Sequence, residues 1–293
     1  MAGGIGSRLY PISTPEKPKQ FLDLLGVGKS LIRLTYERFL AVDADAHFWV
    51  VTSESYLHYV TEQLPEIPRE QILLEPVARN TAPCIAYVCR KISLRYPDAK
   101  LVVTPSDAYV PDHDAFALTV RKALDFVPYG ADGSVQDAGA IVTIGIAPDR
   151  PETGYGYIDV RTAMKSSADA EDIVAVSAFK EKPSLEVAQQ YLADGGYYWN
   201  AGIFVFGVQT MLSELREHAP QLSLQMDELQ KSIYTEDEQQ ALATIFPQCE
   251  KISIDYAVME KSSHIYMAPS NWAWSDLGSF EAIEKITGRH IDR

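Results

Sequence analysis

The sequence predicts an α/β fold in which helices cover both faces of an open, mixed but mostly parallel sheet. Three observations support this prediction. Short apolar runs typical of buried strands alternate with amphipathic helical segments up to residue 146, and that alternation is typical of parallel α/β sheets. Turn residues separate these runs. The chain has 293 residues, 46% of them hydrophobic, and can therefore bury a substantial core.

The expected helices follow from apolar spacing and capping residues. Leu31, Leu34 and Phe39 recur at helical spacing, and Asn80 or Thr81 can cap the helix that starts there. The expected helices are residues 29–42, 53–64 (with Ser53 as a cap), 80–96, 114–127 and 185–193, followed by several polar helices between 210 and 245.

The expected strands are short β-branched or aromatic runs. They are residues 47–52, 71–75, 100–104, 140–146, 173–179, 203–206 and 265–268. Residues 152–158 (ETGYGYI) predict a loop. Ligands of open α/β sheets bind beyond the carboxyl ends of the strands, so we expect the functional residues at that edge.

Composition excludes several functions. The chain carries 26 Lys and Arg against 40 Asp and Glu, a net charge of −14, which disfavours nucleic acid or an anionic membrane as a partner. Its three cysteines and six histidines show no metal-binding spacing. No signal peptide or bilayer-length apolar run is visible. These features predict a soluble cytoplasmic protein.

The N-terminal stretch AGGIGSRLYPISTPEKPKQF is the strongest functional signal. Glycines at 3, 4 and 6 allow backbone N–H groups to approach an anion. Arg8 can fork onto phosphate oxygens, and Lys19 adds a compact charge. The third glycine of a dinucleotide fingerprint is replaced by Ser7-Arg8, which points away from NAD.

Other candidates are ambiguous when taken singly. Asp107 and Asp276 would together suit Mg²⁺, but each taken singly is better interpreted as a turn or cap aspartate. Glu181-Lys182 could bind a sugar phosphate or be a solvated pair, and Asn200 could contact a sugar or shape a turn. Glu75 and the Arg79–Thr81 segment could face a purine or cap the next helix.

Read together, the motifs resemble the mannose-1-phosphate guanylyltransferases, within the nucleotidyltransferases that activate sugar 1-phosphates. The opening AGGIGSRLYPIS is similar to that family's AGGxGxRLxPxS signature, and PKQF distinguishes the mannose branch. The segments EPVARNTAP, TPSD, TGYGYI, EKP, WNAGIF, SIDYAVME and WSDLGSF then follow in the family's order across almost the whole chain. The resemblance implies a Rossmann-like, three-layer nucleotidyltransferase fold.

The resemblance also implies a role for each candidate residue. The residues implied to grip GTP phosphates are Gly3, Gly4, Gly6, Arg8 and Lys19, with Asp107 also at the nucleotide. Those implied around guanine and ribose are Glu75, Arg79, Asn80 and Thr81. Asp107 and Asp276 would hold Mg²⁺. Mannose 1-phosphate would be positioned by Gly156, Glu181, Lys182, Asn200 and Asp255. The catalytic set is thus Arg8, Lys19, Asp107, Lys182 and Asp276.

The implied reaction transfers GMP from GTP to mannose 1-phosphate, giving GDP-mannose and pyrophosphate. Two alternatives stay open: a nucleotidyltransferase for another sugar 1-phosphate, and a catalytically silent nucleotide-sugar-binding homologue. Ala108 and Ala201 stand where family members usually carry His and Ser, so the rate or the substrate fit is expected to differ. Ala108 and the missing first strand keep the silent alternative open.

The resemblance bears on domain organisation too. Residues 1–293 are expected to be a single nucleotidyltransferase domain, without the C-terminal β-helical or isomerase domain of family members, so isomerase activity is not expected. A buried strand is expected just before residues 2–4, and we expect that the natural start lies upstream or that this is a fragment. A homodimer is compatible with the resemblance.

Overall fold

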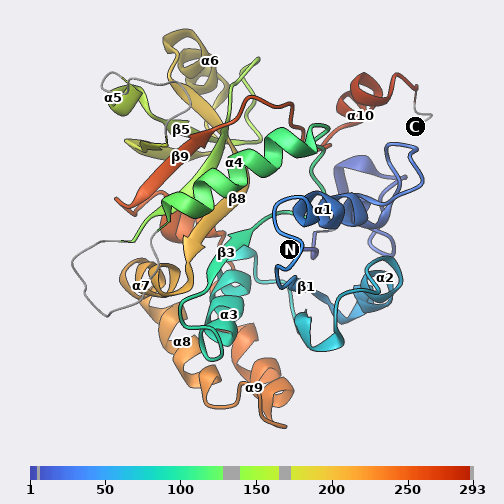
Figure 1. The fold of residues 1–293 in the computed structure, drawn as a ribbon, viewed down its shortest axis with the longest axis vertical. Coiled ribbons are helices and arrows are strands. Elements are labelled where there is room, and N and C mark those ends of the chain that lie inside the picture. Colours follow the sequence, from blue (N-terminus) through green and yellow to red (C-terminus); the bar gives the residue numbers. More distant parts are fainter. Residues whose placement is uncertain (5–6, 128–138, 165–172, 291–293) are drawn as a thin grey trace. The chain divides into compact units, whose positions relative to one another are not determined.

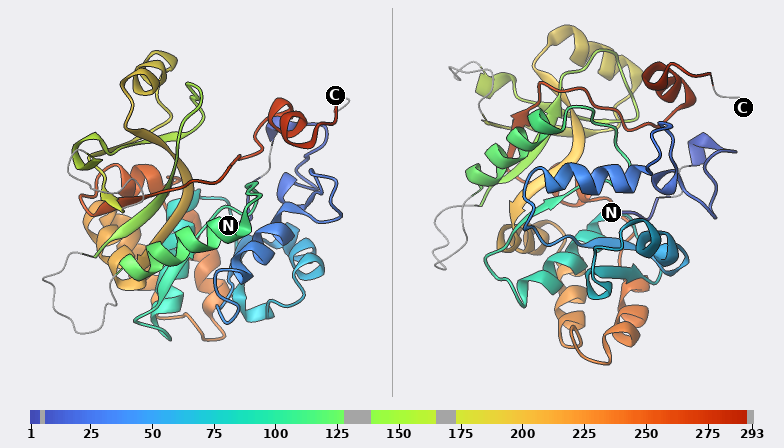
Figure 2. Two further views of the ribbon diagram at one scale, coloured as in Figure 1. Left: turned by 45° about the horizontal axis from the view of Figure 1, so that its top comes forward. Right: turned by 45° about the vertical axis from the view of Figure 1, so that its right-hand side comes forward.

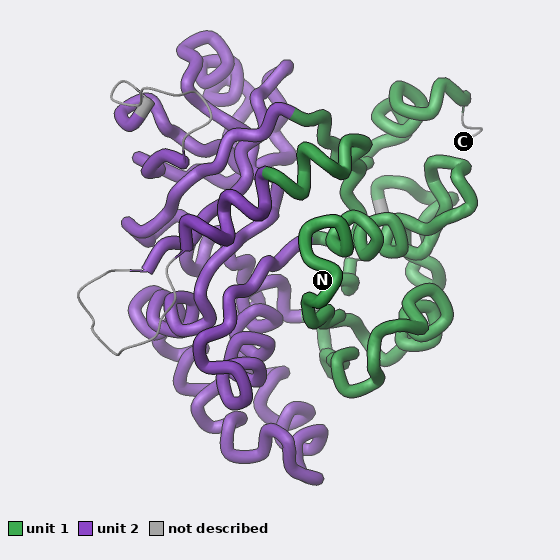
Figure 3. Tube along the Cα trace, in the orientation of Figure 1, with its two compact units in different colours: residues 1–78, 105–118, 272–293 green, residues 79–104, 119–271 purple. Residues whose placement is uncertain are grey.

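The computed structural model describes residues 1–4, 7–127, 139–164 and 173–290. Contacts divide the chain into two compact units, and each is described by itself below. Unit 1 comprises residues 1–78, 105–118 and 272–293, and unit 2 comprises residues 79–104 and 119–271 (Figure 3). Each unit is therefore assembled from segments that are distant in the sequence.

Unit 1 is built on two short parallel strands, β1 (Val50–Ser53) and β2 (Ile72–Glu75). Its longer helices are α1 (Leu31–Leu40), α2 (Leu57–Gln63) and α10 (Phe280–Thr287). Its single-turn helices are η1 (Ser7–Leu9), η2 (Lys19–Phe21), η3 (Glu54–Tyr56) and η4 (Arg69–Gln71). Ser30 caps α1 by accepting a bond from the Arg33 N–H, as a serine at this position usually does.

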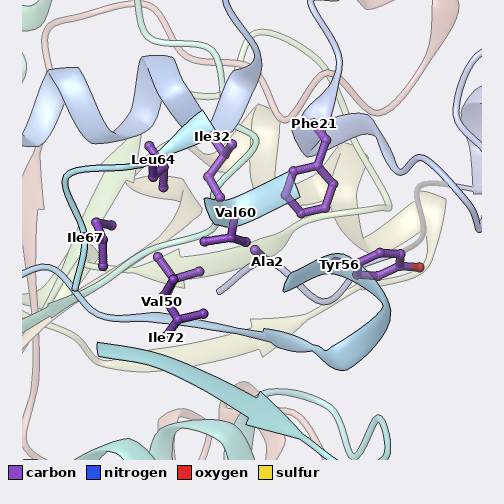
Figure 4. Close-up of a cluster of buried hydrophobic side chains, with 9 residues drawn as sticks. All are labelled: Ala2, Phe21, Ile32, Val50, Tyr56, Val60, Leu64, Ile67 and Ile72. Atoms are coloured by element: carbon purple, nitrogen blue, oxygen red, sulfur yellow. The ribbon is translucent and has the colours of Figure 1, made fainter. Parts of the chain in front are cut away.

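The main core of unit 1 lies between β1, β2, α1 and α2 (Figure 4). Its buried residues are Ala2, Phe21, Ile32, Val50, Tyr56, Val60, Leu64, Ile67 and Ile72. Phe21 stacks on Tyr59 with ring centroids 5.0 Å apart. The N–H of Ala2 donates to the Val51 carbonyl at 2.8 Å. The N-terminal segment is thus held beside β1 by both packing and a backbone bond.

A second cluster packs η1 and α1 against the C-terminal segment. Leu9, Leu31, Leu277 and Ile283 are its buried members. Leu9 directly follows Arg8 and Leu277 directly follows Asp276. Burial of these two leucines therefore brings their charged neighbours close together.

Unit 2 contains a seven-stranded mixed sheet organised around the long strand β8 (Tyr197–Gly207) (Figure 1). β8 runs antiparallel to β3 (Lys100–Val103), β4 (Ile141–Ile146) and β5 (Gly156–Asp159). The remaining strands are β6 (Val174–Ala175), β7 (Ala178–Glu181) and β9 (Ile265–Pro269). β9 runs parallel to β4, whereas β6 and β7 pair antiparallel with β9 and β5.

Helices complete unit 2. Figure 2 shows α7 (Val208–His218), α8 (Pro220–Gln230) and α9 (Glu238–Ile245) in orange near α3 (Thr81–Ser93) in teal. The other helical elements are α4 (His113–Phe126, which crosses from unit 1 into unit 2), α5 (Arg161–Met164), α6 (Leu185–Asp194), η5 (Phe246–Gln248) and the π-helix η6 (Asp255–Met259).

The α/β class and the mixed sheet are confirmed, but the expectation of a mostly parallel sheet is wrong. Among the described strands, only β1–β2 and β4–β9 are parallel pairs. The physical reason is β8, which is long enough to pair with three strands, all of them in the antiparallel sense. Its length was underestimated because Asn200 and Gly202 resemble turn residues.

Three local expectations also differ from the structure. The predicted loop at 152–158 ends in a strand, β5, because Gly156–Asp159 pairs with both β7 and β8. The predicted strand 173–179 is divided between β6 and β7. Ser53 precedes η3 without accepting a capping bond through its side chain.

Candidate active site

Four of the predicted site residues form a charged cluster in unit 1. Lys19 Nζ lies 3.1 Å from Asp107 Oδ2 and donates to the Asp276 carbonyl at 2.5 Å. Arg8 Nη2 lies 3.2 Å from Asp276 Oδ2. Lys19 is only 8% exposed, whereas the Arg8 side chain is largely exposed. Lys19 therefore connects the two aspartates, and Arg8 remains available to solvent.

The backbone around the two aspartates fixes their relative position. Tyr109 and Ser275 form an antiparallel bridge with reciprocal N–H···O bonds of 2.8 and 3.1 Å. The Asp276 carboxylate also accepts the Gly278 N–H at 3.0 Å. A Cβ at Gly278 would come within 2.5 Å of Asp276 Oδ2 and 2.9 Å of Arg8 Nη2. The absence of a side chain at Gly278 thus makes room for the Arg8–Asp276 pair.

The described N-terminal glycine Gly3 lies near Glu75, the last residue of β2. A Cβ at Gly3 would lie 3.7 Å from Glu75 Oε2, and a Cβ at Gly4 would meet no atom within 4 Å. Gly6 lies outside the described residues. The buried Gln20 amide donates to the Ala2 and Gly4 carbonyls at 3.1 and 2.9 Å. The structure therefore brings Gly3 and Glu75 together and holds the loop through Gln20.

Three sugar-phosphate candidates lie on neighbouring strands of the sheet of unit 2. Gly156 of β5 pairs with Glu181 of β7, and Asn200 directly follows Trp199 of β8, which pairs with Tyr157 of β5. Residues opposite each other on adjacent strands project from the same face of a sheet. A Cβ on Gly156 would lie 2.6 Å from Glu181 Oε2. Gly156 therefore leaves space that the Glu181 carboxylate uses.

Asn200 is held in one orientation by three contacts. Its Oδ1 accepts bonds from Thr143 Oγ1 at 2.8 Å and from the Gly202 N–H at 3.0 Å. Its Nδ2 donates to Asp255 Oδ1 at 3.2 Å. The β4–β8 register shifts between Thr143 and Gly145, and such irregularities often occur beside active sites. The Oδ1 atom of Asn200 thus already accepts two hydrogen bonds within the protein, while its amide N–H₂ group can donate a second bond.

The charges around Lys182 and Asp255 are strongly coupled. Lys182 Nζ donates to Glu181 Oε1 at 2.7 Å, and Lys182 adopts a positive φ of 46°. Burial raises the pKa of Asp255 to about 6, and the nearby Glu181 charge adds to this effect. Burial alone would lower the pKa of Lys182, but its bond to Glu181 and the charge of Asp255 raise it overall. Lys182 therefore keeps its positive charge at neutral pH.

The Arg79–Thr81 segment contacts the chain just before Asp255. Asn80 (φ 68°) caps α3 through a 2.8 Å bond from the Thr81 N–H. Thr81 Oγ1 accepts the Ile254 N–H at 2.8 Å, and Arg79 donates to the Pro247 carbonyl. The capping role expected of Asn80 is thus confirmed, and the nucleotide contacts of this segment stay a prediction.

Sequence reasoning missed two polar residues that support the site. Gln20 lies within the PKQF motif, so its position next to Lys19 was a usable signal. Thr143 lies in an apolar strand and is fully buried. Only the fold, which places it beside Asn200, reveals what it does.

The mixed sheet of unit 2 and its helices define an α/β protein. Comparison with known proteins agrees with this class. A sequence profile of the nucleotidyl transferase family matches residues 1–292. The chain belongs to this family.

Individual relatives resemble the chain over nearly its full length. A mannose-1-phosphate guanylyltransferase of Escherichia coli K12 is 38% identical, over 98% of this chain and 59% of its own length. A solved structure from Thermus thermophilus, described as a mannose-1-phosphate geranyltransferase, has a TM-score of 0.82 at 29% identity, over 99% of this chain and 78% of that one. A Helicobacter pylori structure, described as a mannose-6-phosphate isomerase, has a TM-score of 0.69 at 30% identity, over 89% of this chain and 95% of that one. The chain spans about three-fifths of the length of curated relatives such as this Escherichia coli enzyme.

Nucleotidyl transferases generally use a divalent metal ion, and the residues of unit 1 fit one. Asp107 and Asp276 offer hard carboxylate oxygens, and both side chains are a quarter exposed. Within the described ranges, no group of three or more His, Cys, Asp or Glu side chains could hold a metal. A site of two carboxylates completed by phosphate oxygens and water is the arrangement that Mg²⁺ usually adopts.

Among the helices of the described segments, none combines the length and apolar character needed to cross a membrane.

Proposed function

We propose that the chain transfers GMP from GTP to α-D-mannose 1-phosphate, releasing pyrophosphate and forming GDP-mannose. The observation that carries the proposal is the Lys19-centred cluster of Arg8, Asp107 and Asp276, which combines two cations with two carboxylates. Such a cluster suits a nucleoside triphosphate bound together with a divalent cation. The names of the curated relatives support the choice of guanine and mannose.

The residues of unit 1 would bind the nucleotide. The backbone of Gly3 and Gly4, together with Arg8 and Lys19, would hold the phosphates. Glu75 would contact the guanosine part of the nucleotide. The roles of Arg79, Asn80 and Thr81 at guanine and ribose stay a prediction. Asp107 and Asp276 would hold Mg²⁺, which when bound neutralises charge on the phosphate oxygens. We propose that the two compact units act as one nucleotidyltransferase domain. A homodimer stays a prediction.

The residues of unit 2 would orient the sugar phosphate. Lys182 would neutralise its phosphate, and Glu181, Asn200 and Asp255 would bind sugar hydroxyls beside Gly156. A phosphate oxygen of mannose 1-phosphate would attack the α-phosphorus of GTP in line with the departing pyrophosphate. That phosphate is largely dianionic at neutral pH, so it needs no general base. Catalysis would therefore rest on positioning and on charge neutralisation by Arg8, Lys19 and Lys182.

Pyrophosphate release tests the proposal directly. The purified chain is assayed with Mg²⁺, each common nucleoside triphosphate, and mannose or glucose 1-phosphate. We expect the fastest release with GTP and mannose 1-phosphate. Faster release with another pair would identify a different sugar nucleotidyltransferase. Tight GDP-mannose binding without turnover would identify a silent homologue, and isomerisation of mannose 6-phosphate without pyrophosphate release would also contradict the proposal.

Thr143→Val should weaken sugar-phosphate binding specifically. The substitution removes the hydroxyl that donates to Asn200 Oδ1 and keeps the size of the side chain. Loss of one buried hydrogen bond is worth about 1 kcal/mol, or about fivefold in affinity. We expect KM for mannose 1-phosphate to rise about fivefold, while KM for GTP stays within about twofold. Thr143→Ser keeps the hydroxyl and should behave as the unmodified protein; an equal rise in both KM values would contradict the assignment.

A further inference from the structure

Two buried polar residues of α1 contact the segment that carries Asp107. Thr35 Oγ1 donates to the Ser106 carbonyl at 3.2 Å, and Arg38 Nη2 donates to the Ala108 carbonyl at 3.2 Å. Arg38 Nη2 also donates to Thr35 Oγ1 at 2.9 Å. The two carbonyls belong to the residues on either side of Asp107. The backbone is therefore held from α1 both before and after this aspartate.

Arg38 is an unusual core residue. It is only 3% exposed, and no carboxylate in the described part of the chain forms an ion pair with it. Burial lowers its pKa to about 10, so the guanidinium stays charged at neutral pH. Its Cζ lies 5.2 Å from the Phe116 ring centroid. A buried cation without a carboxylate partner is costly for stability, so it indicates a role other than stabilising the core.

The surroundings of Arg38 also affect a neighbouring histidine. Burial lowers the pKa of His113, and the positive charge of Arg38 lowers it further, against the opposing charges of Glu37, Asp112 and Asp114. His113 therefore remains largely neutral near pH 7. Of these two residues, Arg38 therefore carries the positive charge near pH 7, and it stays charged through the neutral pH range.

The segment that carries Asp107 also contacts the segment that carries Asp276. Tyr109, two residues after Asp107, forms the bridge to Ser275, which directly precedes Asp276. Phe116, under the Arg38 guanidinium, packs edge-on against Trp272 with centroids 5.3 Å apart. α1 is thus connected to both carboxylate-bearing segments within unit 1.

We propose that Thr35 and Arg38 are positioning residues that fix the backbone of Ser106–Ala108 and so hold the Asp107 carboxylate ready for the divalent cation. The inference rests on the proposed function for the identity of that cation site. Neither side chain touches a substrate; each acts through the carbonyl that it binds. Replacing a residue that hydrogen-bonds to a metal ligand and orients it commonly changes the metal affinity by about 10- to 100-fold.

The test compares Thr35→Val with Thr35→Ser. The two substitutions differ chiefly in the hydroxyl group that binds the Ser106 carbonyl, and both leave the Arg38 charge in place. Binding of Mn²⁺ alone, followed by electron paramagnetic resonance of the free ion, measures the site without turnover. We expect Thr35→Val to weaken Mn²⁺ binding about tenfold and Thr35→Ser to rescue it to within about twofold. Asp107→Asn is the reference for a lost ligand.

Kinetics add a readout that a purely structural role would not produce. In Thr35→Val, the Mg²⁺ concentration for half-maximal GDP-mannose formation should rise about tenfold, while KM for mannose 1-phosphate stays within about twofold. Unchanged Mn²⁺ binding in Thr35→Val overturns the inference, as does unchanged binding in Asp107→Asn. If the unmodified chain makes no GDP-mannose, the proposed function fails, but the Mn²⁺ comparison still decides the inference.

Discussion

Asp107→Asn is expected to lower the rate of GDP-mannose formation by at least about 10²-fold. Asparagine keeps the size of the side chain and an oxygen that can accept a bond from Lys19 Nζ, which lies 3.1 Å from Asp107 Oδ2. It removes the negative charge that the proposed cation site requires. The loss should appear mainly in kcat, because charge neutralisation matters most in the transition state.

The stability of Asp107→Asn should change little. The lost ion pair is partly exposed on the aspartate side, and such pairs are typically worth about 0–1 kcal/mol. Urea denaturation checks this expectation. Asp149→Asn is the matched control, since that carboxylate is largely exposed and pairs with the adjacent Arg150. Full activity in Asp107→Asn, with fold and stability intact, would reject the metal assignment.

Local patterns predicted most helices of this chain, because helix signals lie close together in the sequence. The expected helix 29–42 corresponds to α1, and Asn80 caps α3 as expected. α10 was not expected, although Ser279 caps it through a bond from the Ala282 N–H. It has only eight residues, ending at Thr287 before the cap Gly288, so the periodic signal is short.

Strand pairing was less predictable, because it depends on residues distant in the sequence. β5 contains Gly156, and glycine is unfavourable in strands. Pairing with β7 on one side and β8 on the other nevertheless makes Gly156–Asp159 a central strand. The local sequence at residues 152–158 does not predict pairing with these two strands.

The same limit applies to the site. The glycine–arginine–lysine loop could be recognised alone, because its chemistry lies within a short stretch. The contact of Lys19 with both Asp107 and Asp276 required the fold. Thr35, Arg38 and Thr143 lie at positions that look like ordinary helix or strand residues, and only their tertiary contacts show what they hold.

Asp255→Asn is expected to make the protein more stable at neutral pH and less active. Burial and the Glu181 charge raise the pKa of Asp255 from 3.8 to about 6. Between these two values the folded protein holds a proton that the unfolded chain has lost, so stability falls as the pH rises through this window. Above about pH 7 the full cost of the buried charge is present, and its removal should stabilise the fold by about 1–3 kcal/mol.

Urea denaturation at two pH values tests whether Asp255→Asn raises or lowers the stability of the fold. At pH 4 the Asp255 carboxyl is protonated in the folded protein, so Asp255→Asn should differ little from the unmodified chain. At pH 7.5 the variant should unfold at higher urea, with an unchanged m value. The exposed Asp149→Asn serves as the control at both pH values. Equal stability at pH 7.5, or a less stable variant there, would contradict the expected charge burial.

The Asp255 charge destabilises the fold, and we expect it to contribute to catalysis. The Asp255 carboxylate accepts the Asn200 amide at 3.2 Å and helps to raise the pKa of Lys182. Hydrogen bonds to charged groups are worth about 1.5–3 kcal/mol, so kcat/KM for mannose 1-phosphate should fall at least about tenfold in Asp255→Asn. A more stable but less active variant is the pattern expected of a strained binding site. A variant that is both more stable and fully active would remove Asp255 from the sugar-phosphate site.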